Sequence, residues 1–246
     1  MLTAAAFVPS PPLLVPELTG AAASETDQLR RAALDVASRL GRVSTEWTVL
    51  AVADPDAPSA GEVAPEKCGS FAGFGVDVRV SLSPDASGRD TDRSMPLPAL
   101  VAGWLRGAAA PDARVRVRLL APETTSDDCV RLGRELRAEL DARPEPQALL
   151  VVADGANTLT DKAPGAFDER SPHIQSGLDA ALADGDCDAL GRLDPGTCRE
   201  IGLAGRAAWQ TFAAVFSGPA GGPRKSESLY AGAPYGVGYH VGMWLP

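Results

Sequence analysis

The sequence predicts an α/β fold: one domain over residues 1–246, with helices on both faces of a central, mostly parallel or mixed sheet. Short apolar runs at residues 2–8, 47–54 and 147–154 have the composition of strands that are buried on both faces. Segments with apolar residues at helical spacing separate these runs. The alternation continues along the chain without an internal repeat or an obvious linker, which favours a single domain.

The first half of the chain contains most of the predicted sheet. Strands are expected at 2–8, 47–54, 75–82 and 113–120, and helices at 21–40 and 97–108. In the last of these strands Arg114, Arg116 and Arg118 alternate with apolar residues. This pattern is typical of an edge strand with one solvated face, and an anion-binding face is the alternative interpretation.

The second half begins with a predicted helix at 126–142 and the strand at 147–154, followed by helices at 172–184 and 195–216. Asp194 is the expected N-cap of the last helix, because Pro195 suits the first helical position. The segment "SLYAGAPYGVGYHVGMWLP" then predicts a pair of strands interrupted by glycines.

Charge and cysteine content exclude several classes of function. The chain has 32 acidic and 23 basic residues, a net charge of −9, which argues against nucleic acid or an anionic membrane as a partner. No segment approaches the roughly 20 apolar residues of a membrane span, and Pro9 interrupts the apolar start, so a signal peptide is not expected. The 4 scattered cysteines form no CxxC pair, which predicts reduced thiols and a cytoplasmic location.

Polar side chains follow three of the predicted buried strands. Ser10 follows the strand at 2–8. Asp54 and Asp56 lie at and beyond the end of the run 47–54, and Asp154 and Asn157 lie at and beyond the end of the run 147–154. Ligands of open α/β sheets bind at the carboxyl ends of the strands, so these residues are candidates for one cleft. Serine, aspartate and asparagine also form turns and helix caps, and their spacing alone leaves both interpretations open.

The motifs of nucleophilic and dinucleotide-dependent enzymes are missing from the sequence. It contains neither the GxSxG elbow of hydrolases nor a GxGxxG turn after a strand. Of the two histidines, His173 lies at a predicted helix start, and His240 shares one face of "GVGYHVGMW" with glycines. His240 is therefore either a wall of a cleft or a hydrogen-bonded core histidine, and a nucleophilic triad has little support.

Five segments together resemble a known family. In chain order they are "FVPSPPLLVPEL" (7–18), "GSFAGFG" (69–75), "VVADGANTLTDKAPGAF" (151–167), "CREIGLAGRAAW" (198–209) and "YAGAPYGVGYHV" (230–241). They are similar to the P-H-P-P opening, the G-D-F-x-x-F-G, S-G-D-x-S-H and E-C-G segments, and the closing Y-x-G-P-F-G-V-G-Y of the class III extradiol ring-cleavage dioxygenases. The resemblance is to the subunit-B type, which includes the Memo-like proteins, and in particular to a divergent bacterial branch.

The resemblance implies specific site residues and an extradiol dioxygenase subunit-B-like fold. The three iron-ligand positions of the family fall on Ser10, Asp56 and Glu200, and the acid–base histidine falls on Asn157 or, with a shift of one residue, Thr158. A hydroxyl and two carboxylates are poor substitutes for the imidazoles that Fe(II) oxygenases use. Asn157 cannot accept a proton near neutral pH.

We therefore expect a cleft without the standard iron centre. The first hypothesis is a divergent, non-cleaving protein without a cofactor that binds a small polar or aromatic ligand, with Asp154 and Asn157 in the cleft. The second is an active Fe(II) dioxygenase with a non-standard site, for example Asp56, Glu200 and His240. The third is a scaffold that binds a protein partner. The chain could also form a homo-oligomer.

Overall fold

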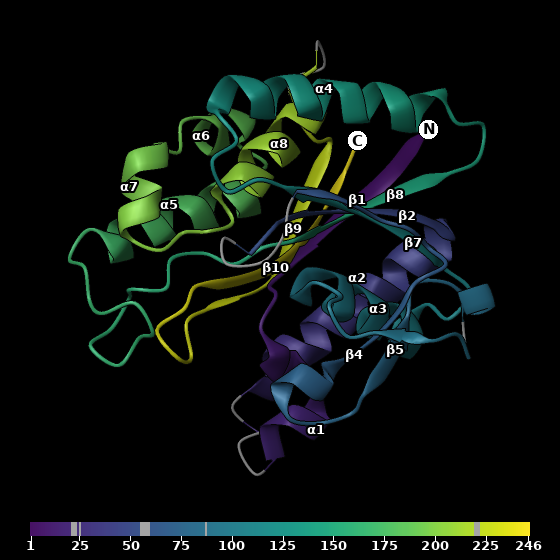
Figure 1. Cartoon of the computed structure of the whole chain (residues 1–246). Coiled ribbons are helices and arrows are strands. Elements are labelled where there is room, and N and C mark those ends of the chain that lie inside the picture. The colour runs from purple at the N-terminus through teal and green to yellow at the C-terminus, as the bar shows by residue number, and fades with distance from the viewer. Residues whose placement is uncertain (21–23, 25, 55–59, 87, 219–221) are drawn as a thin grey trace.

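The computed structural model describes residues 1–20, 24, 26–54, 60–86, 88–218 and 222–246. It shows an α/β fold on a mixed, seven-stranded sheet with the order β3-β7-β2-β8-β1-β10-β9 (Figure 1). Its strands are β1 (Leu2–Val8), β2 (Glu46–Val52), β3 (Gly61–Val63), β7 (Arg114–Leu120), β8 (Gln147–Val152), β9 (Lys225–Gly232) and β10 (Tyr239–Leu245). Strands β7, β2, β8 and β1 are mutually parallel. Strands β3 and β10 pair antiparallel with them, and β9 pairs antiparallel with β10.

Helices cover both faces of this sheet (Figure 1). They are α1 (Pro16–Thr19), α2 (Asp27–Val43), α3 (Leu97–Ala109), α4 (Ser126–Ala142), α5 (Ser171–Asp184), α6 (Cys187–Gly191), α7 (Pro195–Glu200) and α8 (Arg206–Phe216). Helices α2 and α3 pack on one face, and α4, α5, α6 and α8 lie on the other. Along β1 the side chains alternate between the two cores, with Ala6 and Val8 in one and Phe7 in the other. Burial on both faces explains the continuous apolar run in the sequence.

A small second sheet lies beside α3. It has the order β5-β4-β6, with β4 (Cys68–Ser70), β5 (Arg79–Ser81) and β6 (Thr91–Asp92). Between β4 and β5 the segment Phe71–Phe74 forms a 3-10 turn, which the Ser70 side chain caps by accepting from the Ala72 N–H. The strand expected over 75–82 is therefore shorter than predicted and does not belong to the main sheet.

The arginine-bearing face of β7 is a network of ion pairs. The pairs are Arg114 with Glu66 and Asp85, Arg116 with Glu62, and Arg118 with Glu62 and Glu139. In the described part of the chain, the sheet beyond β7 has only the three-residue strand β3. The structure thus favours the solvated-face interpretation over an anion-binding face, because carboxylates of the same chain neutralise these guanidinium groups.

The helix expected over 195–216 is two helices in the structure, α7 and α8. Asp194 caps α7 as predicted, its side chain accepting from the Thr197 N–H. The break follows at Gly202, whose φ of +64° is a left-handed conformation that favours glycine. Gly205 is also required, because a Cβ there would lie 2.5 Å from the carbonyl oxygen of Asp154. The turn between α7 and α8 thereby approaches the end of β8.

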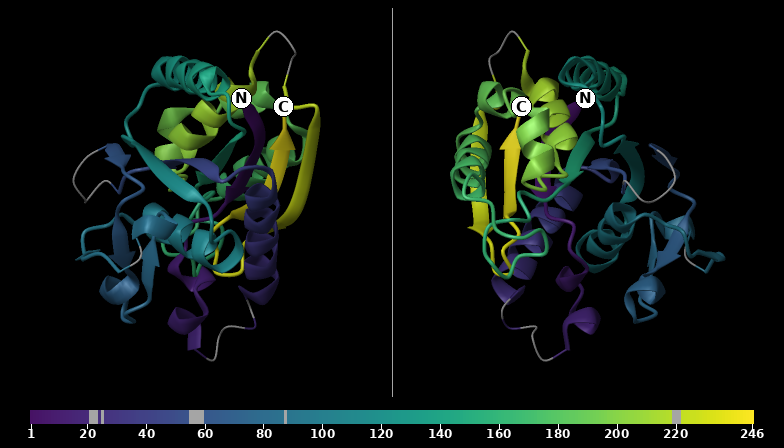
Figure 2. Two further views of the ribbon diagram at one scale, coloured as in Figure 1. Left: turned by 90° about the vertical axis from the view of Figure 1, so that its right-hand side faces the viewer. Right: turned by 60° about the vertical axis from the view of Figure 1, so that its left-hand side comes forward.

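The first and last strands are neighbours in the sheet. Strand β1 pairs with β8 on one side and with β10 on the other. Both ends of the chain consequently lie at the same end of the molecule (Figure 2). Within the described ranges, no helix has the length and apolar character needed to cross a lipid bilayer.

Candidate functional site

A cavity of about 470 Å³ opens at the carboxyl ends of β1, β2 and β8. These strands are parallel neighbours, so the residues that follow them meet at one edge of the sheet. The cavity is lined by Ser10, Val52, Ala53, Asp54, Gly73, Phe74, Arg93, Ser94, Met95, Pro96, Leu97, Pro98, Val152, Ala153, Asp154, Ala204 and Gly205. It is the part of the described structure that best matches the cleft expected from the sequence.

Ser10 and Asp154 form the polar floor of this cavity. Val8 of β1 and Val152 of β8 are register partners, so the residues two positions further on lie opposite each other. The Ser10 hydroxyl donates to one carboxylate oxygen of Asp154 at 2.7 Å, and the Ser10 backbone N–H donates to the other at 2.8 Å. The indole N–H of Trp209 donates to the Asp154 carbonyl at 3.2 Å, which holds the backbone of this residue against α8.

The surroundings of Asp154 raise its pKa above the usual value of an aspartate. Burial of the carboxylate is the main cause, because a charge in a low-dielectric environment is costly, and the two hydrogen bonds from Ser10 partly oppose it. Part of the residue still faces the cavity. Asp154 is therefore a carboxyl group that a ligand can reach and whose proton is held more tightly than in water.

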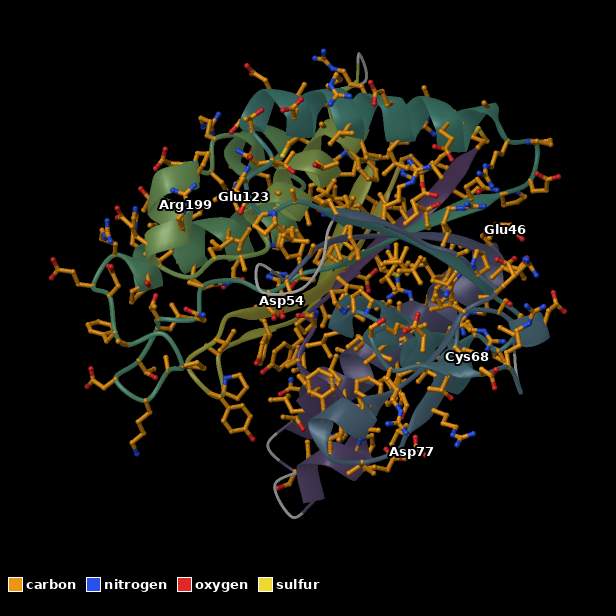
Figure 3. The ribbon with its side chains drawn as sticks, viewed as in Figure 1. Glu46, Asp54, Cys68, Asp77, Glu123 and Arg199 are labelled. Carbon is orange, nitrogen blue, oxygen red and sulfur yellow. The ribbon has the colours of Figure 1, made fainter. Side chains whose placement is uncertain are left out.

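The other walls are largely apolar and come from distant parts of the chain. Phe74 ends the turn after β4, Met95 and Pro96 precede α3, and Pro98 lies in its first turn. Arg93, in the same loop as Met95, adds a positive charge to the cavity wall. Asp54, which follows β2, adds a carboxylate. Figure 3 shows Asp54 below the helical layer that contains α7. Phe74 lies in the family-like "GSFAGFG" segment, whereas no motif pointed to Arg93 or Met95.

Glu200 is separate from this cavity, which corrects the expectation that it lies with Ser10. It is the last residue of α7, is exposed, and accepts a hydrogen bond of 2.7 Å from Arg170. Arg170 also binds Asp168, and its hydrogen bonds are the main reason why the pKa of Asp168 is lowered to about 2. The break between α7 and α8 brings Ala204 and Gly205, not Glu200, to the cavity.

Asn157 does not line the cavity either. Its side chain packs over Gly165 and Gly202, where a Cβ on either glycine would overlap it. Its backbone N–H donates to the Ile201 carbonyl, and its carbonyl accepts from the Gly165 N–H. Thr158, the alternative position, is buried and donates to the same Ile201 carbonyl at 2.9 Å. Both residues connect the loop after β8 to the turn after α7.

His240 is a buried, hydrogen-bonded histidine that does not face the cavity. It lies on β10, is 3% exposed, and contacts the Phe7 ring. Its Nδ1 lies 2.9 Å from Asp179 Oδ1, and its Nε2 lies 2.9 Å from Ser228 Oγ. Neither Asp179 nor Ser228 is predicted from the sequence, because they lie on a helix and a strand with no local motif in common.

Among the residues that the structure describes, the family's ligand positions do not fit an Fe(II) ion. The Ser10 hydroxyl is used as a donor to Asp154, and Glu200 points to Arg170 outside the cavity. Asp56 lies outside the described residues. The described residues also contain no group of three or more His, Cys, Asp or Glu side chains arranged to hold a metal ion. Of the alternative set Asp56, Glu200 and His240, the structure describes the last two, and neither lines the cavity.

Comparisons with known proteins show similarity of fold. No family model matches the sequence, and a search of curated proteins gives no match. Among solved structures, the uncharacterized protein JW3007 from Escherichia coli K12 is similar over 98% of this chain and 99% of its own, with a TM-score of 0.54 and 12% identity. At this identity the likeness extends to the α/β fold and not to function.

Proposed function

We propose that this protein is a divergent relative of the class III extradiol dioxygenases, subunit-B type, that binds a small aromatic or polar ligand without iron-dependent ring cleavage. One observation carries the proposal: Ser10, at the family's first iron-ligand position, donates its hydroxyl to Asp154 at the floor of the cavity. A cavity is present, and by the resemblance the hydrogen-bonded Ser10 corresponds to a metal ligand of the family.

A further observation supports a relation to this family. The five family-like segments occur in the expected order, and four of them, 7–18, 69–75, 151–167 and 198–209, contribute residues to the cavity lining.

The lining suggests how a ligand binds. An aromatic ring would pack against Phe74 and Met95, and a hydroxyl would exchange hydrogen bonds with Asp154 and Ser10. Arg93 would pair with a carboxylate substituent of the ligand. An aromatic acid with a ring hydroxyl combines these three features, and it would lie at the carboxyl ends of the strands, as ligands of open α/β sheets do.

Ligand-induced stabilisation tests the proposal. The thermal midpoint of the purified protein is measured with 4-hydroxybenzoate, with 3,4-dihydroxybenzoate and, as a smaller probe, with phenol. A ligand that binds only the native state raises the midpoint with concentration. We expect at least one of the two acids to do so, and phenol to bind more weakly because it lacks the carboxylate.

Two variants locate the binding. Ala204→Trp places a large side chain at the exposed edge of the cavity and should abolish the shift, whereas Glu200→Gln, outside the cavity, should leave it unchanged. A shift that survives Ala204→Trp would place the ligand elsewhere. Lack of stabilisation by any of the three probes would remove the support for a ligand of this chemistry and favour the scaffold hypothesis.

A further inference from the structure

A second polar arrangement lies away from the cavity, on the edge of the sheet that β9 forms. Asp179 Oδ1, His240 Nδ1, His240 Nε2 and Ser228 Oγ follow one another at hydrogen-bond distance, 2.9 Å at each contact. The three residues come from α5, β10 and β9. The order of acid, imidazole and hydroxyl is that of the serine hydrolase triad, a constellation that occurs on unrelated folds.

The hydrogen-bond network favours the tautomer that such a triad needs. The Asp179 carboxylate accepts at His240 Nδ1, so Nδ1 carries the proton of the neutral ring and Nε2 is free to accept from the Ser228 hydroxyl. Gln175, one turn before Asp179 on α5, donates to the same carboxylate oxygen at 3.0 Å. Gln175 also accepts from the Ala156 N–H, which ties α5 to the loop after β8 and fixes the position of the carboxylate.

The local backbone brings Ser228 to the imidazole. The register between β9 and β10 shifts between Val241 and Gly242, so that Ser228 lies opposite Gly242 while His240 lies opposite Ala231. Shifts of this kind redirect side chains and occur often beside active sites. Gly242, opposite Ser228, must be a glycine, because the Phe7 ring and the Glu227 carbonyl oxygen fill the position that a Cβ would take.

Burial decreases from the base to the hydroxyl. His240 is 3% exposed, the Asp179 side chain is 27% exposed, and Ser228 is exposed on the surface. A histidine with a purely structural role does not need a partner that solvent can reach. A nucleophile does, since its oxygen must meet a substrate while its base stays in a defined orientation.

We propose that Ser228 is the nucleophile of a second site, which hydrolyses short-chain carboxylic esters. Ser228 Oγ bonds to the ester carbonyl carbon while His240 Nε2 takes the hydroxyl proton. The C–O bond to the alcohol then breaks, and the alcohol leaves with that proton. Water attacks the acyl-serine, His240 takes a proton from the water, and the acid is released as the proton returns to Ser228 Oγ. Asp179 positions the imidazole and stabilises its charged form.

The surroundings define the class of substrate. Strand β9 is the last in the sheet order, so within the described residues no strand pairs with its outer edge. Alternate backbone N–H groups of such an edge point outward and can donate to the oxyanion that forms beside Ser228. Because Ser228 lies on the surface, the acyl group approaches from solvent, which favours acetyl and other short acyl chains.

The test measures covalent labelling and turnover on the full chain. The protein is treated with a fluorophosphonate probe, and the labelled residue is identified by mass spectrometry. Hydrolysis of 4-nitrophenyl acetate is followed in parallel for Ser228→Ala and for the matched control Ser226→Ala, which lies on the same strand opposite Trp244. We expect labelling at Ser228 and a loss of about 100-fold in kcat for Ser228→Ala, with Ser226→Ala close to the parent protein.

The role of Asp179 needs its own measurement. Asp179→Asn favours the wrong tautomer of His240 and should lower kcat with little change in KM, while Asp184→Asn, near the end of the same helix, should change neither. Circular dichroism shows that each variant is folded. Equal hydrolysis by folded Ser228→Ala and Ser226→Ala, or labelling at another residue, would overturn the proposal. Binding in the Ser10 cavity is independent of either result.

Discussion

The two hydrogen bonds from Ser10 to Asp154 join the segments that follow β1 and β8, residues 144 positions apart in the sequence. Ser10 donates to the carboxylate through both its hydroxyl and its backbone N–H. The pair therefore fixes the ends of two neighbouring strands to each other at the floor of the cavity. The protonation of Asp154 can be measured through its effect on the stability of the protein.

Stability should depend on pH through Asp154. Its folded-state pKa is raised by burial above the usual 3.8, so the folded protein holds this proton more tightly than the unfolded chain. The contribution of Asp154 to the free energy of unfolding is fully present below about pH 4 and is lost as pH rises through the raised pKa. Asp154→Asn removes this dependence, and the free energy of unfolding of the variant should decline less with rising pH than that of the parent.

Urea denaturation at about pH 4, 6 and 8 measures this difference. Asp54→Asn is the control, because Asp54 lines the same cavity but is exposed. Curves for Asp154→Asn and the parent that stay parallel over the whole range would show that the carboxyl group titrates normally.

Iron binding should be weak. Of the family's ligand positions within the described structure, Ser10 is engaged with Asp154 and Glu200 with Arg170, and neither supplies imidazole. After anaerobic loading with Fe(II) and desalting, we expect elemental analysis to find far less than one iron per chain. A stoichiometric amount that Ser10→Ala abolishes would instead support the dioxygenase hypothesis.

The contact between α4 and α8 should depend on Gly133. A Cβ on this residue would overlap the Thr211 carbonyl oxygen and the Ala214 side chain of α8. Gly133→Ala should lower the free energy of unfolding by roughly 1–3 kcal/mol, the usual cost of overpacking. Gly177→Ala is the matched control: this exposed position in α5 has no atom within 4 Å of the new methyl group, and the change should stabilise the helix by about 0.5–1 kcal/mol. Urea denaturation measures the free energy of unfolding of both variants. Equal values for Gly133→Ala and Gly177→Ala would show that α4 and α8 can move apart without a loss of stability.

Two cysteines should react slowly in the native state. Burial raises the pKa of the Cys187 and Cys198 thiols to about 11, so only a small fraction is thiolate at about pH 8. Thiol–disulfide exchange with an aromatic disulfide reagent should therefore proceed slowly at these two residues in the native protein and fast after unfolding in urea, as peptide mapping can follow. Rapid labelling of Cys198 without denaturant would contradict its burial.

The sequence predicted the elements whose burial pattern is simple. Strands β1, β2 and β8 are apolar on both faces, and α2, α3 and α4 begin and end within a few residues of their predicted bounds, except that the predicted start of α2 was six residues early. The break between α7 and α8 was missed, because it depends on the left-handed Gly202 and on the approach of Gly205 to Asp154, a residue 51 positions earlier. Local patterns contain no information on such a contact.

The candidate site was predictable only in part, for the same reason. The position of Ser10 and Asp154 at neighbouring strand ends follows from the parallel sheet, whereas the cavity walls Arg93 and Met95 come from a loop without regular structure. Asp179 and Ser228 had no sequence signal at all. Their contact with His240 requires both the packing of α5 on the sheet and the register shift between β9 and β10.

The place of β1 in the sheet has a consequence for biosynthesis. Strand β1 precedes the other elements in the chain, yet its two partners, β8 and β10, are Gln147–Val152 and Tyr239–Leu245. While the nascent chain leaves the ribosome, this apolar strand has two unpaired edges until residues 147–152 and 239–245 have been synthesised, and unpaired edges favour association with other chains. We therefore expect newly made protein to require a chaperone that holds this segment, and its yield in cells to depend more on chaperone supply than the stability of the finished fold would indicate.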